Sequence, residues 1–113
     1  MRKFLICLFL LAGFAVAQRD SQHSVKLSWL DPLNPEGTTY TVHRTPGLCS
    51  GTANYDKIAD GVTGLTYTDS TVQPGNYCYV VTAVLNGMES APSNAASASV
   101  PAFPPQNLSV EVQ

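Results

Sequence analysis

The feature that most constrains the fold is a two-residue alternation of apolar and polar side chains in short runs. Residues 23–30 alternate His, Val, Leu and Trp with Ser and Lys, and residues 76–85 alternate in a similar way. Successive side chains of a β-strand point to opposite faces of a sheet, so each run predicts a half-buried strand. Pro-Gly, Asp-Gly and Asn-Gly pairs, which are typical of turns, separate the runs. The spacing of strands and turns predicts an all-β sandwich.

The alternation also predicts which side chains face the core. Besides the two runs above, strands are expected over 39–44, over 55–59, around 65–67 and within 93–100. The apolar and aromatic positions on one face of these strands form the predicted core: Val25, Leu27, Trp29, Tyr40, Val42, Tyr67, Tyr77, Tyr79 and Val81.

The N-terminus has the pattern of a secretory signal peptide. Two basic residues precede an apolar stretch over 4–12, and Ala15-Val16-Ala17 provides a small-residue cleavage site. The apolar stretch is too short for a membrane span, although an uncleaved anchor is the alternative. We therefore expect a cleaved leader over 1–17, no membrane span after cleavage, and a secreted, periplasmic or cell-envelope protein.

The chain has three cysteines, and Cys7 is expected to leave with the leader. The remaining pair, Cys49 and Cys78, is an even number in an exported small domain, which predicts one disulfide. Free thiols or a metal site are the alternatives, but a metal site needs more ligands than this pair supplies.

Charge and motifs weigh against several classes of function. The formal net charge is −2, charged residues make up 12% and no basic run occurs, so no nucleic-acid partner is expected. The two histidines, His23 and His43, have no acidic or cysteine partner at close spacing, and no nucleophile motif or calcium loop is present. We expect no catalytic residues, no metal and no cofactor.

The assembled strands resemble a fibronectin type III domain, particularly the bacterial modules of secreted proteins. The resemblance covers residues 23–101 and is carried by VKLSW, YTVHR, LTYTDSTVQPGNYCYVVTAV and NGMESAPSN. Tyr77, after a Pro-Gly turn, occupies the place of the family's tyrosine corner. The resemblance implies an immunoglobulin-like sandwich over 18–101. It also implies antiparallel pairing of the third and sixth strands, which places Cys49 near Cys78 in a disulfide on the surface.

The chain departs from that family at both ends of the domain. The opening strand is expected to be missing, because only residues 18–22 precede the second strand after leader cleavage. The segment 102–113 contains two prolines and then an alternation that resembles the opening strand of a next repeat: Leu108, Val110 and Val112. This tail could fold back on its own domain, remain disordered or be donated head-to-tail to another copy, with weak self-association.

The resemblance implies a non-enzymatic binding or spacer module that contacts a protein or cell-envelope surface. A carbohydrate-binding accessory module associated with polysaccharide degradation is the alternative, and a strand-donating assembly is a second alternative. Five residues on the outer face of the sheet with the third, sixth and seventh strands, or in a loop, form the candidate contact surface: Thr41, His43, Tyr55, Val80 and Val84. Its partner would be a protein or a polysaccharide.

Overall fold

The structure, a computed structural model, describes residues 23–51 and 54–113 of the chain. The predicted leader, residues 1–17, lies outside the described residues. Within them the chain forms strands and no helix. The strands are β1 (His23–Ser28), β2 (Thr39–Pro46), β3 (Asp56–Val62), β4 (Thr66–Val72), β5 (Gly75–Leu85), β6 (Met88–Glu89) and β7 (Ala96–Val100). All the predicted strands are present with shifted ends, and β6 is additional.

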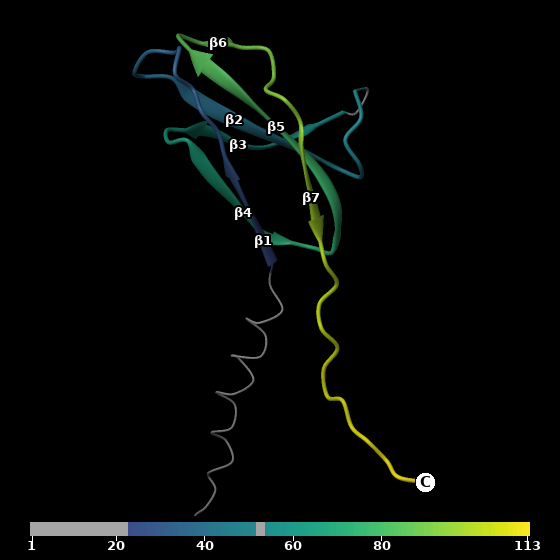
Figure 1. Cartoon of the computed structure of the whole chain (residues 1–113). Helices are drawn as coiled ribbons and strands as arrows, with labels where there is room; N and C mark the ends of the chain where they lie inside the picture. The colour runs from purple at the N-terminus through teal and green to yellow at the C-terminus, as the bar shows by residue number, and fades with distance from the viewer. Residues whose placement is uncertain (1–22, 52–53) are drawn as a thin grey trace, which may run out of the picture.

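The strands form two antiparallel sheets that face each other as a sandwich (Figure 1). The small sheet consists of β1 and β4, which pair along the whole of β1. The large sheet has the order β3-β2-β5, and β6 and β7 share the other edge of β5. This arrangement confirms the all-β sandwich that the alternation predicts.

The core lies between the sheets and is densest along β2 and β5. Val42 is fully buried and Tyr79 is 2% exposed, and Tyr40 is also buried. The other six predicted core residues are half-buried: Val25, Leu27, Trp29, Tyr67, Tyr77 and Val81. Most of these lie on the small sheet or at its margin, where two strands cannot cover a side chain on all sides.

A polar cluster joins the two sheets through the core. Asp69 on β4 is 6% exposed, and its carboxylate accepts hydrogen bonds from Arg44 Nη1 on β2 (2.8 Å) and from the Tyr79 hydroxyl on β5 (2.7 Å). Burial and the hydrogen bond to Asp69 raise the pKa of Tyr79 well above its usual value. The alternation does not predict this cluster, because it assigns charged residues to the solvent face.

Tyr77 behaves as a tyrosine corner. Its hydroxyl donates to the backbone carbonyl of Gln73, four residues earlier, at 2.9 Å. The Arg44 guanidinium lies 5.4 Å from the centre of the Tyr77 ring. Tyr77 thus fixes the turn that leads into β5 and covers one side of the half-buried Arg44 side chain, which pairs with Asp69.

The disulfide joins Cys49 and Cys78, whose Cα atoms are 5.1 Å apart. Its placement at the surface is only half right, because Cys78 is fully buried whereas Cys49 is exposed. Cys78 does face away from the space between the sheets. The Tyr55 hydroxyl, however, lies 3.2 Å from Cys78 Sγ, so the segment that leads into β3 covers this part of the outer face.

The loop between β1 and β2 is held by a carboxylate. Asp31 accepts two hydrogen bonds from Asn34 Nδ2 (2.9 and 2.8 Å) and one from the Tyr40 hydroxyl (2.7 Å). These bonds lower the pKa of Asp31. The Tyr40 ring in turn packs against Trp29, with ring centres 5.4 Å apart. The loop is therefore tied to the start of β2.

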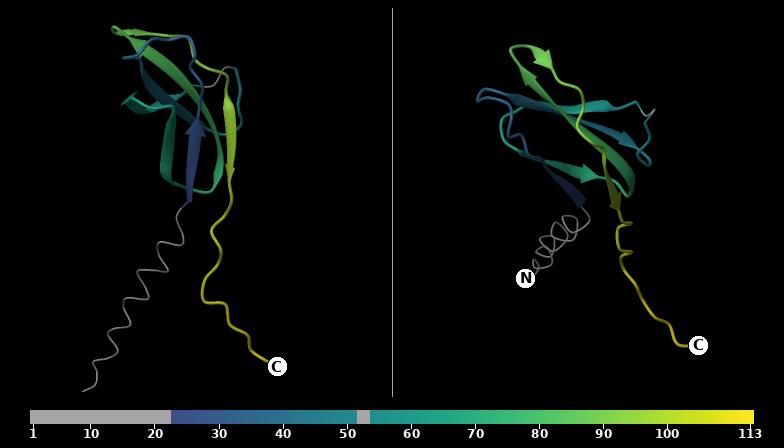
Figure 2. Two further views of the ribbon diagram at one scale, coloured as in Figure 1. Left: turned by 60° about the vertical axis from the view of Figure 1, so that its left-hand side comes forward. Right: turned by 45° about the horizontal axis from the view of Figure 1, so that its top comes forward.

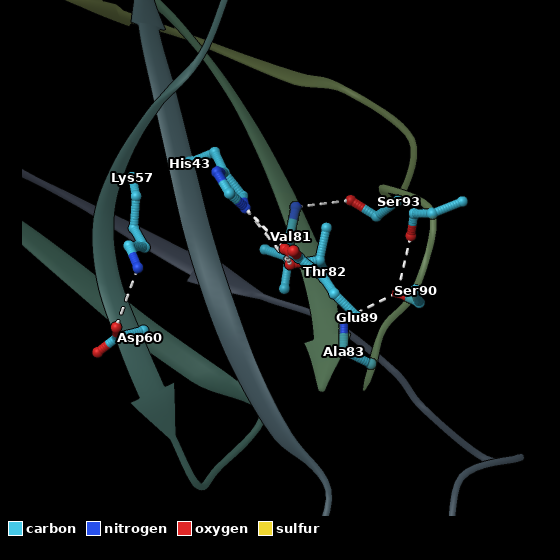
Figure 3. A network of polar contacts seen from close by, with 10 residues as sticks. His43, Lys57, Asp60, Val81, Thr82, Ala83, Glu89, Ser90 and Ser93 are labelled. Carbon is cyan, nitrogen blue, oxygen red and sulfur yellow. Dashed lines mark hydrogen bonds and ion pairs between the residues drawn. The ribbon is translucent and has the colours of Figure 1, made fainter. Parts of the chain in front are cut away.

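Between β6 and β7, two serines hydrogen-bond to the edge of β5 in place of a strand (Figure 3). Ser90 donates its N–H to Ala83 O (2.8 Å) and accepts from Ala83 N through Oγ (2.9 Å). Ser93 makes the same pair of contacts with Val81, at 2.8 and 3.0 Å. The side chains thus replace backbone carbonyls, and the β5 edge is satisfied without a regular strand.

The C-terminal segment 101–113 carries no strand and runs away from the sandwich from the end of β7 (Figures 1 and 2). Its first aromatic residue is attached to the domain: the Phe103 ring stacks on His23, with ring centres 4.7 Å apart. Leu108, Val110 and Val112 are each more than 80% exposed. The predicted extra strand is therefore unpaired in this structure.

Candidate functional site

The outer face of the large sheet carries a hollow. It consists of an open groove of about 600 Å³ across β2, β3 and the β5–β6 hairpin, and an adjoining hollow of about 300 Å³ toward Pro92. Both are lined by His43, Tyr55 and Glu89. We call the two together the outer-face groove.

The structure brings all five residues of the candidate contact surface to this groove. His43, Tyr55 and Val84 are half-buried and line it with accessible atoms. Thr41 and Val80 are buried, with 6% and 9% of their surface exposed, so they form its floor.

The centre of the groove is a hydrogen-bonded trio from three strands (Figure 3). The Thr82 hydroxyl on β5 donates to Glu89 Oε2 on β6 at 2.5 Å. His43 Nε2 on β2 lies 3.3 Å from the Thr82 hydroxyl oxygen and 3.5 Å from the same carboxylate oxygen. The bond from Thr82 lowers the pKa of Glu89, and His43 adds to this effect. The trio therefore presents an ionised carboxylate beside an imidazole.

A second charged pair borders the groove on β3. Lys57 Nζ lies 3.2 Å from Asp60 Oδ2, and both side chains are more than half exposed. Such an exposed pair adds little to stability. Its ammonium and carboxylate groups remain available to a ligand that enters from solvent.

Tyr55 supplies the aromatic surface of the groove. Its hydroxyl contacts Cys78 Sγ, so the ring is fixed above the disulfide and is half-buried. The sequence places Tyr55 near a loop. The structure adds that the Cys49–Cys78 disulfide holds this loop against the sheet.

Glu89, Lys57 and Asp60 also line the groove, and none of them is among the residues that the sequence predicts there. A signal for Glu89 exists in the Asn86-Gly87 pair, which predicts a tight hairpin. In that hairpin Glu89 lies opposite Val84, as the structure shows. Lys57 and Asp60 have no comparable signal, because the position of β3 beside β2 depends on tertiary structure.

The groove offers groups that can bind a ligand. Its hydroxyl, imidazole, carboxylate and ammonium groups can exchange hydrogen bonds with a polar ligand, and its aromatic ring and valines can contact apolar atoms. Among residues 23–51 and 54–113, no group of three or more His, Cys, Asp or Glu side chains could hold a metal ion. The same residues include no helix that is long and apolar enough to cross a membrane.

Comparisons with known proteins place the chain in a family. No family model matches it. A segment of an amylopullulanase from Thermoanaerobacter thermohydrosulfuricus is 45% identical over 85 residues, which cover 71% of this chain. The chain spans only 5% of that enzyme's length. The crystal structure of an Fn3-like protein from Clostridium thermocellum matches with a TM-score of 0.58 and 32% identity, over 72% of this chain and 80% of that one. The chain thus belongs to the fibronectin type III-like family, as the sequence motifs predict.

Proposed function

We propose that the chain is a non-catalytic accessory module of extracellular polysaccharide degradation, and that its outer-face groove binds a glycan. The similarity to a segment of an amylopullulanase, a polysaccharide-degrading enzyme, is the observation that carries this proposal. The Fn3-like fold is typically a non-catalytic module. The disulfide is in keeping with an extracellular location, because such bonds persist in oxidising compartments.

The chemistry of the groove supports a sugar ligand. A sugar ring combines a face of C–H groups with a rim of hydroxyls. The groove offers a matching combination, with the Tyr55 ring beside the His43 and Glu89 hydrogen-bonding groups. A site of this kind fixes orientation with a few polar groups and gains affinity from apolar contact.

The charges of the groove favour a ligand without net charge. Lys57 is compensated by Asp60 at 3.2 Å, and Glu89 accepts a hydrogen bond from Thr82. With His43 neutral, Lys57, Asp60 and Glu89 give the groove a net charge of −1, so it would repel a strongly anionic ligand. A neutral glycan avoids this repulsion, whereas an acidic polysaccharide does not.

The proposal is tested by titrating the exported protein with soluble pullulan, amylopectin and an acidic polysaccharide as the comparison, using isothermal calorimetry. We expect binding to a neutral glycan and none to the acidic one. Glu89→Ala and Lys57→Ala should each weaken binding several-fold. Glu36→Ala, an exposed acidic residue in the loop between β1 and β2, is the matched control and should not affect binding.

Each negative result has a distinct meaning. No binding to any glycan would overturn carbohydrate recognition. Binding that is unchanged in both groove variants would overturn the assignment to this groove. Tyr55→Ala is the less suitable variant, because Tyr55 also covers the buried sulfur of Cys78.

A further inference from the structure

The small sheet has an unpaired edge. β1 hydrogen-bonds to β4 along one side, and no other described strand pairs with it. An exposed strand edge presents unpaired N–H and C=O groups that can accept another strand. A two-stranded sheet is marginally stable, and a third strand would bury more of its apolar face. Val25 and Leu27 on that face are only half-buried.

The C-terminal segment has the pattern of a strand that lacks a partner. Its three apolar side chains alternate with Ser109 and Glu111, and all of these residues are exposed. We propose that residues 108–113 of one copy add to the free edge of β1 in a second copy. The added strand runs antiparallel to β1.

The antiparallel register follows from the two apolar patterns. If Val110 lies opposite Leu27, then Leu108 lies opposite Trp29 and Val112 opposite Val25. All three apolar pairs then face the core. A shift by one residue would turn the apolar residues of the tail toward solvent, so the register is specific.

The same register pairs the charges of the two segments. It places Glu111 directly opposite Lys26, and these are the only Asp, Glu, Lys or Arg residues in 103–113 and in β1. Both side chains are exposed, and neither forms an ion pair within the described residues. An opposite-charge pair across antiparallel strands is stabilising, whereas a like-charge pair is destabilising.

While Phe103 stacks on His23, the chain cannot make this pairing with its own β1. Phe103 is held at the beginning of β1 by its stacking on His23. An antiparallel strand would have to start beside Trp29, about 20 Å away at the usual rise per residue. The five residues from Phe103 to Leu108 span about 18 Å at most, before any chain reversal.

The direction of the tail also favours a second copy. Phe103 and Pro104 each precede a proline, which keeps their backbone extended. The tail continues away from the sandwich in both views of Figure 2. A copy stacked beyond the end of β7 can receive it without a reversal, and repetition of this contact gives a head-to-tail chain of domains.

Sedimentation velocity of the exported protein over a concentration series tests the proposal. We expect association that rises with concentration. Val110→Asp should abolish it, and a peptide of residues 106–113 should block it. Trp29 is the only tryptophan, so its fluorescence should shift when the peptide binds.

A charge exchange tests the register. Glu111→Lys and Lys26→Glu should each weaken association about fivefold, and the double exchange should restore it. Glu36→Lys is the control for net charge and should not reproduce the effect of Glu111→Lys.

The outcomes separate this proposal from its alternatives. A protein that stays monomeric and does not bind the peptide would overturn it, whether the tail is free or packed on its own domain. Association that persists in Val110→Asp would assign it to another surface. Lack of rescue in the double exchange would overturn the register. The outer-face groove lies on the other sheet, so none of these results depends on glycan binding.

Discussion

The two sheets of this sandwich differ in how completely their strands are covered. On the large sheet the middle of β5 is buried on both sides: Tyr79 faces the core, while Cys78 and Thr82 face outward and are still buried. On the small sheet β1 alternates between half-buried and exposed residues, and none is fully buried. The difference shows that the outward-facing side chains of a strand are buried only where a loop or another side chain lies over them.

The cover of the large sheet comes from loops and side chains rather than from another sheet. Tyr55 and the disulfide lie over Cys78, and the Glu89 side chain lies over Thr82. The small sheet has no such cover among the described residues. It is joined to the large sheet by Asp69, which binds Arg44 and Tyr79. We infer that the large sheet carries most of the stability and that β1 is the part open to a partner.

The largest expected effect is the loss of a fully packed aromatic residue from the large sheet. Tyr79→Ala should lower the free energy of unfolding by about 3–5 kcal/mol, the cost of truncating a buried aromatic residue. Tyr67 on β4 is only half-buried, so Tyr67→Ala should lower the free energy of unfolding by about half as much. Urea denaturation of both variants checks this difference. Equal losses would contradict the inference that the two sheets contribute unequally.

The second effect concerns the disulfide that covers the large sheet. The double variant Cys49→Ala/Cys78→Ala should lose about 3–4 kcal/mol of stability, because the bridge closes a loop of 29 residues in the unfolded chain. Wild-type protein with the bridge chemically reduced is the matched comparison in urea denaturation. If the reduced protein keeps the free energy of unfolding of the oxidised protein, the segment over Cys78 does not depend on the disulfide.

The third effect concerns the contact between the sheets. Asp69→Asn should cost about 1–3 kcal/mol, because it removes the charge that satisfies the Arg44 and Tyr79 donors. The control is Asp60→Asn in the exposed pair on β3, for which we expect less than about 1 kcal/mol. Thermal unfolding of the two variants side by side measures the difference. If the two variants lose the same stability, the Asp69 cluster does not stabilise the contact between the sheets.

The smallest effect appears at alkaline pH. Burial raises the pKa of Tyr79 in the folded protein, whereas in the unfolded chain the hydroxyl ionises near 10. The contribution of the neutral hydroxyl is therefore complete below pH 10 and falls as pH rises above it. Tyr79→Phe should reduce this decline, measured as the free energy of unfolding between pH 8 and pH 11. An unchanged slope would mean that other groups cause the decline.

The sequence predicts the fold better than it predicts the surface. Alternation locates β1 and β5, and it predicts that Val42 and Tyr79 point into the core. It can do so because backbone geometry makes successive side chains of a strand point to opposite faces. It cannot show that Cys78 is buried, since this depends on a loop that arrives from elsewhere in the chain. Nor can it pair Arg44 with Asp69, which lie 25 residues apart and on different sheets.

The candidate site shows the same limit. Thr41, His43, Val80 and Val84 share a face by alternation, and the structure brings them together at the outer-face groove. The acidic centre of the groove, Glu89, could be inferred from its hairpin. The contribution of β3 depends on the packing order of the strands, for which one chain's pattern carries no signal.

Amide hydrogen exchange tests the central claim of unequal sheets most directly. It should be measured on dilute, monomeric protein. We expect the amides of β5 to exchange only through global unfolding, while alternate amides of β1, those on its unpaired edge, exchange much faster. Slow exchange of every β1 amide, at the rate of β5, would contradict the account, because it would mean that the edge of β1 is already covered.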